Sequence, residues 1–184
     1  ASVLLVLDGA YAEFVRKNDY ASGIELVSQH GNVMMTRTFS KLYGLASLRV
    51  GWGYAPAHVI EAVEKVRMTF NVNLMAQATA IAALEDDAFN EESLAHNDRE
   101  LPRLVAGLKA LGLEVIDGVG NFCVARFPET KGKTAGEALA YLKEHGVTVR
   151  GLSGYRMPNH LRVSVGTVEG NDAALKHLKD FLGK

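Results

Sequence analysis

The feature that most constrains the fold is a short apolar run near the start of the chain. Residues 3–7 are all Val or Leu, and Asp8-Gly9 follows directly. An unbroken run of this length that ends at a turn dipeptide is typical of a strand buried on both faces, as in a parallel sheet. Because a domain seldom begins inside a core strand, we expect that residues are missing upstream. The run therefore predicts the later part of a doubly wound α/β domain.

Alternating segments continue this pattern up to about residue 85. Residues 24–27 and 33–36 are short apolar segments that we expect to be strands, the second with the better pattern. Pro56 opens a stretch with apolar residues at helical spacing, which predicts a helix because proline is tolerated in the first turn. Residues 75–85 are apolar and rich in Ala, which predicts a buried helix.

A long amphipathic stretch follows and leads to a second region. It covers residues 87–111, and we expect Pro102 to kink or split its helix, because proline removes a backbone hydrogen bond. In the second region, Thr134 and Glu137 have the spacing of a capping box, and Gly146 is the expected helix stop. Its predicted strands are residues 113–116, 122–127, 147–150 and 161–165, and apolar residues at helical spacing predict a last helix over 174–182.

The chain is therefore predicted to have three parts. Residues 1–75 form part of a large domain with a doubly wound sheet, and residues 76–111 form connecting helices. Residues 112–184 form a small C-terminal α+β domain.

The composition argues against several classes of function. The net charge is −1 and Lys and Arg are scattered, so we expect no nucleic-acid partner and no attraction to an anionic membrane. No apolar run is long enough to span a bilayer. Cys123, the one cysteine, lies in an apolar run and is predicted to be a small core residue. A chain that cannot form an internal disulfide indicates the cytoplasm.

The segment with the most chemical information is residues 36–54, TRTFSKLYGLASLRVGWGY. Hydroxyl side chains flank Lys41, small residues follow it, and Arg49 lies between apolar neighbours. A single Lys is ordinarily a solvated surface residue. An Arg within an apolar run, by contrast, usually has an anionic partner. The combination of these residues indicates a site rather than a plain surface.

This segment resembles the lysine motif of the class I and II aminotransferases, which are fold-type I pyridoxal-phosphate (PLP) enzymes. The matching residues are Ser40-Lys41, the span 44–48, and Arg49-Val50-Gly51. The resemblance implies that Lys41 forms the internal Schiff base with PLP and is the catalytic residue. It also implies that Thr38, Ser40 and Arg49 bind the cofactor phosphate. Hydroxyls and a guanidinium suit a phosphate dianion, and a primary amine suits an aldehyde.

The resemblance extends to the end of the first apolar run. In the family, an Asp at the end of a core strand pairs with the pyridine nitrogen, and a Tyr three residues later contacts the phenolic oxygen of PLP. Asp8 and Tyr11 match this spacing. A carboxylate beside the ring nitrogen keeps that nitrogen protonated, which makes the ring an electron sink. Taken alone, an Asp at the end of a strand is more often the cap of a turn than a cofactor ligand. The same strand pattern also occurs in P-loop ATPases, but no phosphate-binding loop is present in the sequence.

The last part of the resemblance concerns the substrate. In the family, an Arg on a small-domain strand that leads to a Gly-Thr pair binds the anionic group of the substrate. Arg162, before Gly166-Thr167, matches this pattern, and Arg150 is a second candidate. A planar fork of donors suits a carboxylate or a phosphate, although either Arg could be an ordinary surface residue. These strands, together with residues 70–73, favour the histidinol-phosphate aminotransferase subfamily.

The resemblance implies a PLP-dependent transamination of L-histidinol phosphate with 2-oxoglutarate, in histidine biosynthesis and within a homodimer. The alternatives are another fold-type I enzyme, such as a threonine-phosphate decarboxylase, or a non-catalytic aminotransferase-like sensor domain. The family's Gly-rich phosphate loop and its ring-stacking aromatic residue would lie upstream of Asp8. The chain thus matches a C-terminal part without the N-terminal part, and we expect it to be inactive alone. The six histidines show no metal-ligand spacing, so no metal is expected.

Overall fold

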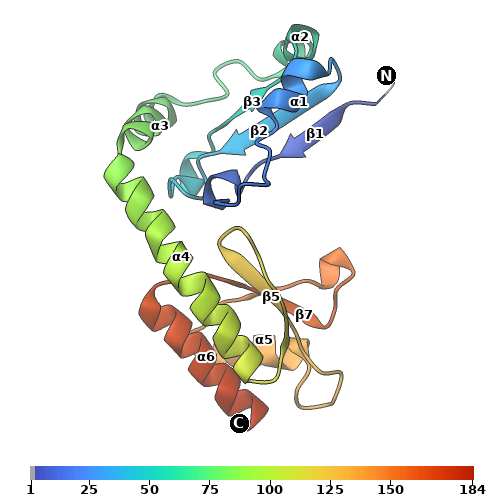
Figure 1. Ribbon diagram of the computed structural model, residues 1–184, viewed down its shortest axis with the longest axis vertical. Coiled ribbons are helices and arrows are strands. Elements are labelled where there is room, and N and C mark those ends of the chain that lie inside the picture. Colours follow the sequence, from blue (N-terminus) through green and yellow to red (C-terminus); the bar gives the residue numbers. More distant parts are fainter. Residues whose placement is uncertain (1–2) are drawn as a thin grey trace. The chain divides into compact units, whose positions relative to one another are not determined.

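The computed structural model describes residues 3–184, and the chain divides into two compact units (Figure 1). The first unit is Ala1–Leu94 and the second is Ala95–Lys184. The boundary falls inside one long helix, α4 (Asp87–Ala110). Each unit has its own sheet, and the two units are described one after the other.

The first unit contains a three-stranded sheet in the order β1-β2-β3. Its strands are β1 (Leu5–Asp8), β2 (Val33–Thr38) and β3 (Gly51–Tyr54). Strands β1 and β2 are parallel, which confirms the parallel pairing predicted for the first run, and β2 and β3 are antiparallel. The predicted burial of the first strand on both faces is wrong for this chain. Leu5 is 47% and Val6 51% exposed, because β1 lies at the edge of the sheet and mainly Leu7 packs inward.

A short helix, α1 (Ile24–Gln29), replaces the strand that was predicted at residues 24–27. Gly23 begins the helix in the left-handed conformation with φ of 95°, and the Ser28 hydroxyl donates to the carbonyl of Ile24. Val27 alone is buried, and it packs with Val33 and Met35 of β2. A segment of four residues is too short to distinguish a helical from a strand period, and this explains the wrong prediction.

Two helices follow the sheet as predicted, α2 (Ala57–Val66) after Pro56 and α3 (Leu74–Glu85). The side chain of Asn73 caps α3 by accepting a hydrogen bond from the Ala76 amide at 2.8 Å. The predicted burial of α3 is wrong for this chain, because only Ala76 and Ala80 are buried. Its large apolar side chains are more than half exposed, namely Leu74, Met75, Ile81 and Leu84.

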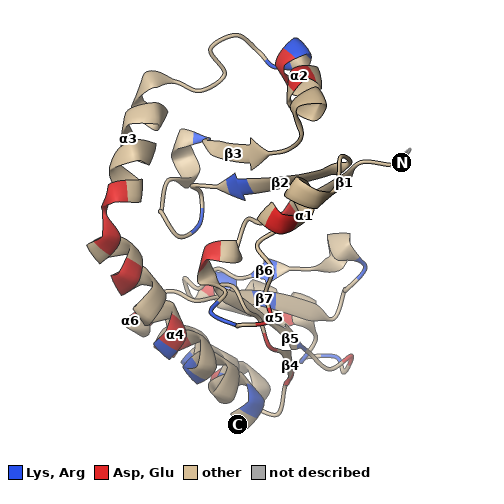
Figure 2. Ribbon diagram, turned by 45° about the horizontal axis from the view of Figure 1, so that its top comes forward, with Lys and Arg blue, Asp and Glu red and all other residues tan. Residues whose placement is uncertain are grey.

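Helix α4 runs without a break through Pro102, so the predicted split at this residue is wrong. A proline within a helix costs about 3 kcal/mol through its missing N–H and its ring. Burial of Leu104 and Leu108 in the next turns offsets this cost, since both side chains are fully buried. The helix begins with Asp87 and has Lys109 in its last turn, which suits the helix dipole (Figure 2).

The second unit contains an antiparallel sheet in the order β4-β5-β7-β6. Its strands are β4 (Glu114–Ile116), β5 (Phe122–Arg126), β6 (Arg150–Gly151) and β7 (His160–Ser164). Three of the predicted strands are confirmed. The strand predicted at 147–150 is wrong in its bounds, because pairing begins only at Arg150. The Val147 amide donates instead to the carbonyl of Leu142, at the end of the preceding helix.

Helices α5 (Ala135–Glu144) and α6 (Val168–Leu182) complete the second unit. The capping box of Thr134 and Glu137 is confirmed. Cys123 is fully buried in one apolar core, which confirms its prediction as a core residue. Side chains from α4, α5, α6 and the sheet fill this core, among them Leu108, Leu142, Leu161 and Leu178.

Candidate active site

The end of β1 places a carboxylate at the edge of the first unit's sheet. Asp8 is the last residue of β1 and is exposed, and its Oδ1 accepts a hydrogen bond from the Ala10 amide at 3.1 Å. The Gly9 amide donates to the carbonyl of Thr36, which extends the pairing with β2 by one residue. A short 3-10 helix, Ala12–Phe14, follows at once. The segment around Asp8 is therefore fixed by backbone hydrogen bonds.

Lys41 lies in a tight turn that follows β2. The amide of Gly44 donates to the carbonyl of Lys41 at 3.0 Å, and the amide of Leu45 donates to the carbonyl of Phe39 at 2.9 Å. Phe39 and Leu42 are buried on either side of the lysine and anchor the turn. The Lys41 Nζ lies 5.1 Å from the ring centroid of Tyr11, a cation–π distance. The structure thus brings together Tyr11 and Lys41, which were predicted from distant parts of the sequence.

The predicted phosphate ligands also lie together. Arg49 Nη1 donates to the Ser40 hydroxyl at 3.3 Å and to the carbonyl of Ala46 at 2.7 Å. The hydroxyl of Thr38 accepts from the Ser40 amide at 3.1 Å. Arg49 ends the 3-10 helix Ala46–Leu48 in the left-handed conformation, with φ of 54°. This conformation is uncommon for a residue with a side chain, and it is typical of functional sites.

Gly51 explains why a glycine follows Arg49 at the start of β3. It is paired with Thr38 across the antiparallel ladder. A Cβ at Gly51 would lie 2.5 Å from the carbonyl oxygen of Arg37, which is far inside van der Waals contact. Only a glycine lets β3 approach β2 so closely. The Arg-x-Gly spacing in the sequence therefore reflects strand packing beside the proposed phosphate ligands.

Arg37 is a half-buried residue of this site that the sequence reasoning missed. Its side chain is 9% exposed, and it lies 3.7 Å from Glu13, whose side chain is 18% exposed. Its Nη2 donates to the carbonyl of Ser22 at 3.2 Å, and its Nη1 to that of Gly9 at 3.5 Å. A charged residue directly after the predicted apolar strand at residues 33–36 could have indicated such a partner.

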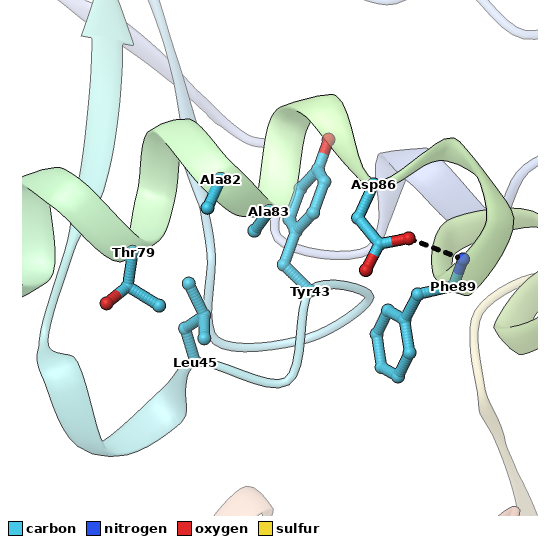
Figure 3. A pocket seen from close by; sticks show the side chains of 7 residues that line it. All are labelled: Tyr43, Leu45, Thr79, Ala82, Ala83, Asp86 and Phe89. Atoms are coloured by element: carbon cyan, nitrogen blue, oxygen red, sulfur yellow. Dashed lines mark hydrogen bonds between the residues drawn. The ribbon is translucent and has the colours of Figure 1, made fainter.

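A pocket of about 290 Å³ lies in the first unit against the lysine turn (Figure 3). Tyr43 and Leu45 of that turn face Thr79, Ala82 and Ala83 of α3, and the pocket also includes Asp86 and Phe89. Asp86 accepts a hydrogen bond from the Phe89 amide at 3.0 Å, which caps the start of α4. Desolvation raises the pKa of Tyr43, and the nearby Glu13 carboxylate adds to this, while Arg37 opposes it. Tyr43 therefore stays protonated at neutral pH.

In the second unit, the two predicted anion ligands are neighbours. Arg150 and Arg162 are directly opposite each other in the antiparallel pair of β6 and β7. Arg150 donates to the Tyr155 hydroxyl at 3.0 Å, in the 3-10 helix Ser153–Tyr155. The Arg162 guanidinium lies 4.8 Å from the Phe122 ring centroid, and its Nε is buried without a hydrogen-bond partner. Two guanidiniums on one face of a sheet suit an anion.

A polar network holds the loop that follows β7. Asn171 Oδ1 accepts from the Gly166 amide at 2.9 Å, and Asn171 Nδ2 donates to Glu100 at 2.7 Å. Arg103 also binds Glu100, at 2.6 Å. Hydrogen bonds from Arg103 and from Asn171 hold the pKa of Glu100 below its ordinary value. The carboxylate is thus kept ionised although Glu100 is buried.

No group of three or more His, Cys, Asp or Glu side chains within residues 3–184 could hold a metal ion. The helices of the same residues include none with the length and apolar character that a membrane span requires.

Comparison with solved structures defines the class of fold. The two units have the fold of the type I PLP-dependent aminotransferases, which confirms the predicted fold class. Histidinol-phosphate aminotransferase from Sinorhizobium meliloti, solved in complex with pyridoxal-5'-phosphate, is 28% identical with a TM-score of 0.88. The similarity covers 98% of this chain and 49% of that one. L-threonine-O-3-phosphate decarboxylase from Porphyromonas gingivalis is 25% identical with a TM-score of 0.83, over 97% of this chain and 55% of that one.

The sequence comparison identifies the family. Residues 1–178 match the family model of aminotransferase class I and II, and the chain belongs to this family. A histidinol-phosphate aminotransferase from Rhodopseudomonas palustris (strain TIE-1) is 48% identical over 182 residues, which is 99% of this chain. The chain spans about half the length of the curated relatives it matches, 50% in this case. The predicted resemblance to the histidinol-phosphate aminotransferases is therefore confirmed.

Proposed function

We propose that the protein is a PLP-dependent aminotransferase that interconverts L-histidinol phosphate and 2-oxoglutarate with imidazole-acetol phosphate and glutamate. The observation that carries the proposal is the position of the Lys41 amine beside Tyr11, next to a cluster of anion-binding groups on the same turn. The 48% identity to a histidinol-phosphate aminotransferase supports the choice of amino donor.

The residues present fit the chemical groups of PLP. A phosphate dianion requires cations and hydroxyls, and Arg49, Ser40 and Thr38 supply both within hydrogen-bond distance of one another. The aldehyde requires a primary amine, which Lys41 supplies. The pyridine nitrogen requires a carboxylate, and Asp8 is exposed at the end of β1 and free of ion pairs with the described residues. These residues would hold the cofactor at the edge of the β1–β2 sheet.

When bound, PLP supplies an electrophilic carbon and a protonated ring that withdraws electrons from the substrate. The chain's own residues would carry the remaining steps. Lys41 would hold the cofactor through its Nζ amine and, when that amine is free, would take up and return the proton of the substrate carbon that bears the amino group, as a general base and acid. Asp8 would keep the ring nitrogen protonated. The Tyr11 hydroxyl would donate a hydrogen bond that orients the group beside Lys41.

Arg162 and Arg150 would bind the anionic end of each substrate. L-Histidinol phosphate presents a phosphate and 2-oxoglutarate presents a carboxylate, so one cationic site has to serve both. Arg162 is half-buried, and its Nε has no hydrogen-bond partner among the described residues, which leaves a donor for such an anion. We further propose that the intact protein acts as a homodimer in the cytoplasm, as expected from the family resemblance and the single cysteine.

Other activities of the same fold remain as alternatives. The fold is shared with the L-threonine-O-3-phosphate decarboxylase of P. gingivalis, so a decarboxylase is the main alternative enzyme. A non-catalytic sensor domain of the aminotransferase type is the second alternative. A sensor would bind PLP or an amine without turnover, whereas a decarboxylase would release CO₂ from threonine phosphate.

The test is an assay of the protein expressed from its complete gene, supplied with PLP. We expect glutamate to form from 2-oxoglutarate only when L-histidinol phosphate is present, and no CO₂ to form from threonine phosphate. Arg162→Gln should raise KM for both substrates and leave covalent attachment of the cofactor unchanged. CO₂ release from threonine phosphate, or PLP binding without turnover of either substrate, would contradict the proposed reaction.

A further inference from the structure

Arg37 links four segments of the first unit through one side chain. It lies on β2, and its guanidinium contacts the carbonyl of Gly9, the carbonyl of Ser22 and the carboxylate of Glu13. The first of these acceptors follows β1, the second precedes α1, and the third lies in the 3-10 helix after Tyr11. The side chain of Arg37 is 9% exposed. Four other arginines that form ion pairs have side chains that are at least 39% exposed, namely Arg16, Arg67, Arg103 and Arg126.

Stability alone does not account for this arrangement. Arg stays charged at every physiological pH, and a buried ion pair is often no more stabilising than apolar residues of the same volume. The Glu13 carboxylate is moreover only half satisfied, because its Oε2 is buried without a hydrogen-bond partner. In some proteins such ionic groups fix a specific conformation, and we infer the same role here.

The conformation that Arg37 fixes is that of the Asp8–Tyr11 segment. A Cβ on Gly9 would lie 2.9 Å from the carbonyl oxygen of Thr36 and 3.1 Å from Cδ and Nε of Arg37. Gly9 is therefore held between the backbone of β2 and the arginine side chain. Asp8 directly precedes Gly9 and Tyr11 lies two residues after it, while Lys41 lies in the turn that follows the strand of Arg37. We therefore expect a change at Arg37 to shift Asp8 and Tyr11 relative to Lys41.

We propose that Arg37 is a positioning residue of the cofactor site, which acts through Gly9 and Glu13 to hold Asp8 and Tyr11 in register with Lys41. This inference rests on the proposed function, since it assumes that these residues receive PLP. It assigns to Arg37 no contact with the cofactor itself. Loss of Arg37 should therefore leave the covalent bond to Lys41 intact, while it weakens the contacts made by Asp8 and Tyr11.

The test compares variants of the protein expressed from its complete gene. Arg37→Lys keeps the charge but loses the planar fork of donors. Arg37→Met combined with Glu13→Gln removes both buried charges, so that neither is left without a partner. Arg67→Gln is the matched control, because Arg67 forms an exposed ion pair with Glu64 on α2. Three properties are measured for each: PLP affinity, the pH midpoint of the absorbance of bound PLP, and borohydride trapping on Lys41.

We expect both Arg37 variants to fold and to trap PLP on Lys41. Their PLP affinity should fall about tenfold, the loss typical of residues that orient direct ligands. The pH midpoint of the absorbance of bound PLP should also move, because this midpoint depends on Asp8 and Tyr11. The double variant, which lacks both charges, should not return the midpoint to its wild-type value. Arg67→Gln should match the wild type.

Wild-type affinity and midpoint in the Arg37 variants would overturn the inference. The inference would also be overturned if the double variant restored both properties. Failure of both variants to fold would overturn it too. Each of these results would mean that Arg37 contributes to stability alone. If the wild type itself fails to trap PLP on Lys41, the proposed function falls, and the inference falls with it.

Discussion

Arg150 of β6 and Arg162 of β7 are directly opposite each other across an antiparallel pair of strands. Like charges in this position destabilise a sheet unless something compensates them. Tyr155 and Phe122 each contact one of the two guanidiniums, but neither carries a negative charge. A bound anion would therefore relieve a repulsion between these two side chains.

Inorganic phosphate is expected to stabilise the second unit through this pair. At a concentration tenfold above Kd, binding to the native state alone adds roughly 1.4 kcal/mol to the free energy of unfolding. Arg162→Gln should lose this gain, as measured by thermal unfolding with and without phosphate. Arg126→Gln is the control, because Arg126 lies on β5 in an exposed ion pair with Glu114. Equal stabilisation of all three proteins would indicate a general salt effect and no anion site.

Substitution of Gly51 by Ala is expected to destabilise the first unit by about 1–3 kcal/mol, because the new methyl group forces β3 away from β2. The added Cβ would lie 2.5 Å from the Arg37 carbonyl. Gly31→Ala is the control, since a Cβ there meets nothing within 4 Å. Urea unfolding of the two variants measures the difference. Equal stability of both would show that the close approach of the two strands is relaxed at little cost.

Acidification is expected to weaken the second unit through Glu100. Because hydrogen bonds hold its native pKa below the unfolded value, the carboxylate stabilises the native state above the unfolded pKa, about 4.3. This stabilisation is lost as the pH falls through the native pKa. The stability difference between wild type and Glu100→Gln should therefore be largest at pH 7 and narrow toward pH 3, as measured by denaturant unfolding. A difference independent of pH would contradict this role of the carboxylate.

Cys123 is expected to be unreactive in the native protein. Burial raises the pKa of its thiol to about 11, with Asp117 as a second cause. Since the thiolate is the nucleophile, iodoacetamide should label Cys123 slowly at pH 8 and rapidly after denaturation in urea. Leu108→Ala, which opens the same core, should increase the native rate. Rapid labelling of the folded wild type would contradict the burial of this residue.

The sequence alone correctly predicted the helices and strands whose pattern is formed by neighbouring residues. The capping box of Thr134 and Glu137, the helix after Pro56 and strand β2 are all decided by residues within a few positions of one another. Thr38, Ser40, Lys41 and Arg49 were found through their resemblance to the family's lysine motif. Asp8 and Tyr11 were found through the family's spacing at the end of a core strand. The proximity of Lys41 to Tyr11 then follows from the parallel pairing of β1 with β2.

The predictions that were wrong or incomplete concern residues whose structure depends on packing or on partners far along the chain. Residues 24–27 have too few positions to separate a helix from a strand, and the packing of Val27 on β2 decides for the helix. Pro102 was expected to interrupt α4, but core packing of Leu104 and Leu108 outweighs one lost hydrogen bond. Arg37 was missed because its role depends on Gly9, Glu13 and Ser22, which no local pattern connects to it.

The most direct test of the account is the identity of the residue that binds PLP. The protein expressed from its complete gene is incubated with PLP, reduced with borohydride, digested and mapped by mass spectrometry. We predict that the cofactor is found on the peptide that contains Lys41, and that Lys41→Ala abolishes both the label and the absorption band of bound PLP. A label on another lysine, or an absorption band that survives in Lys41→Ala, would contradict the central claim.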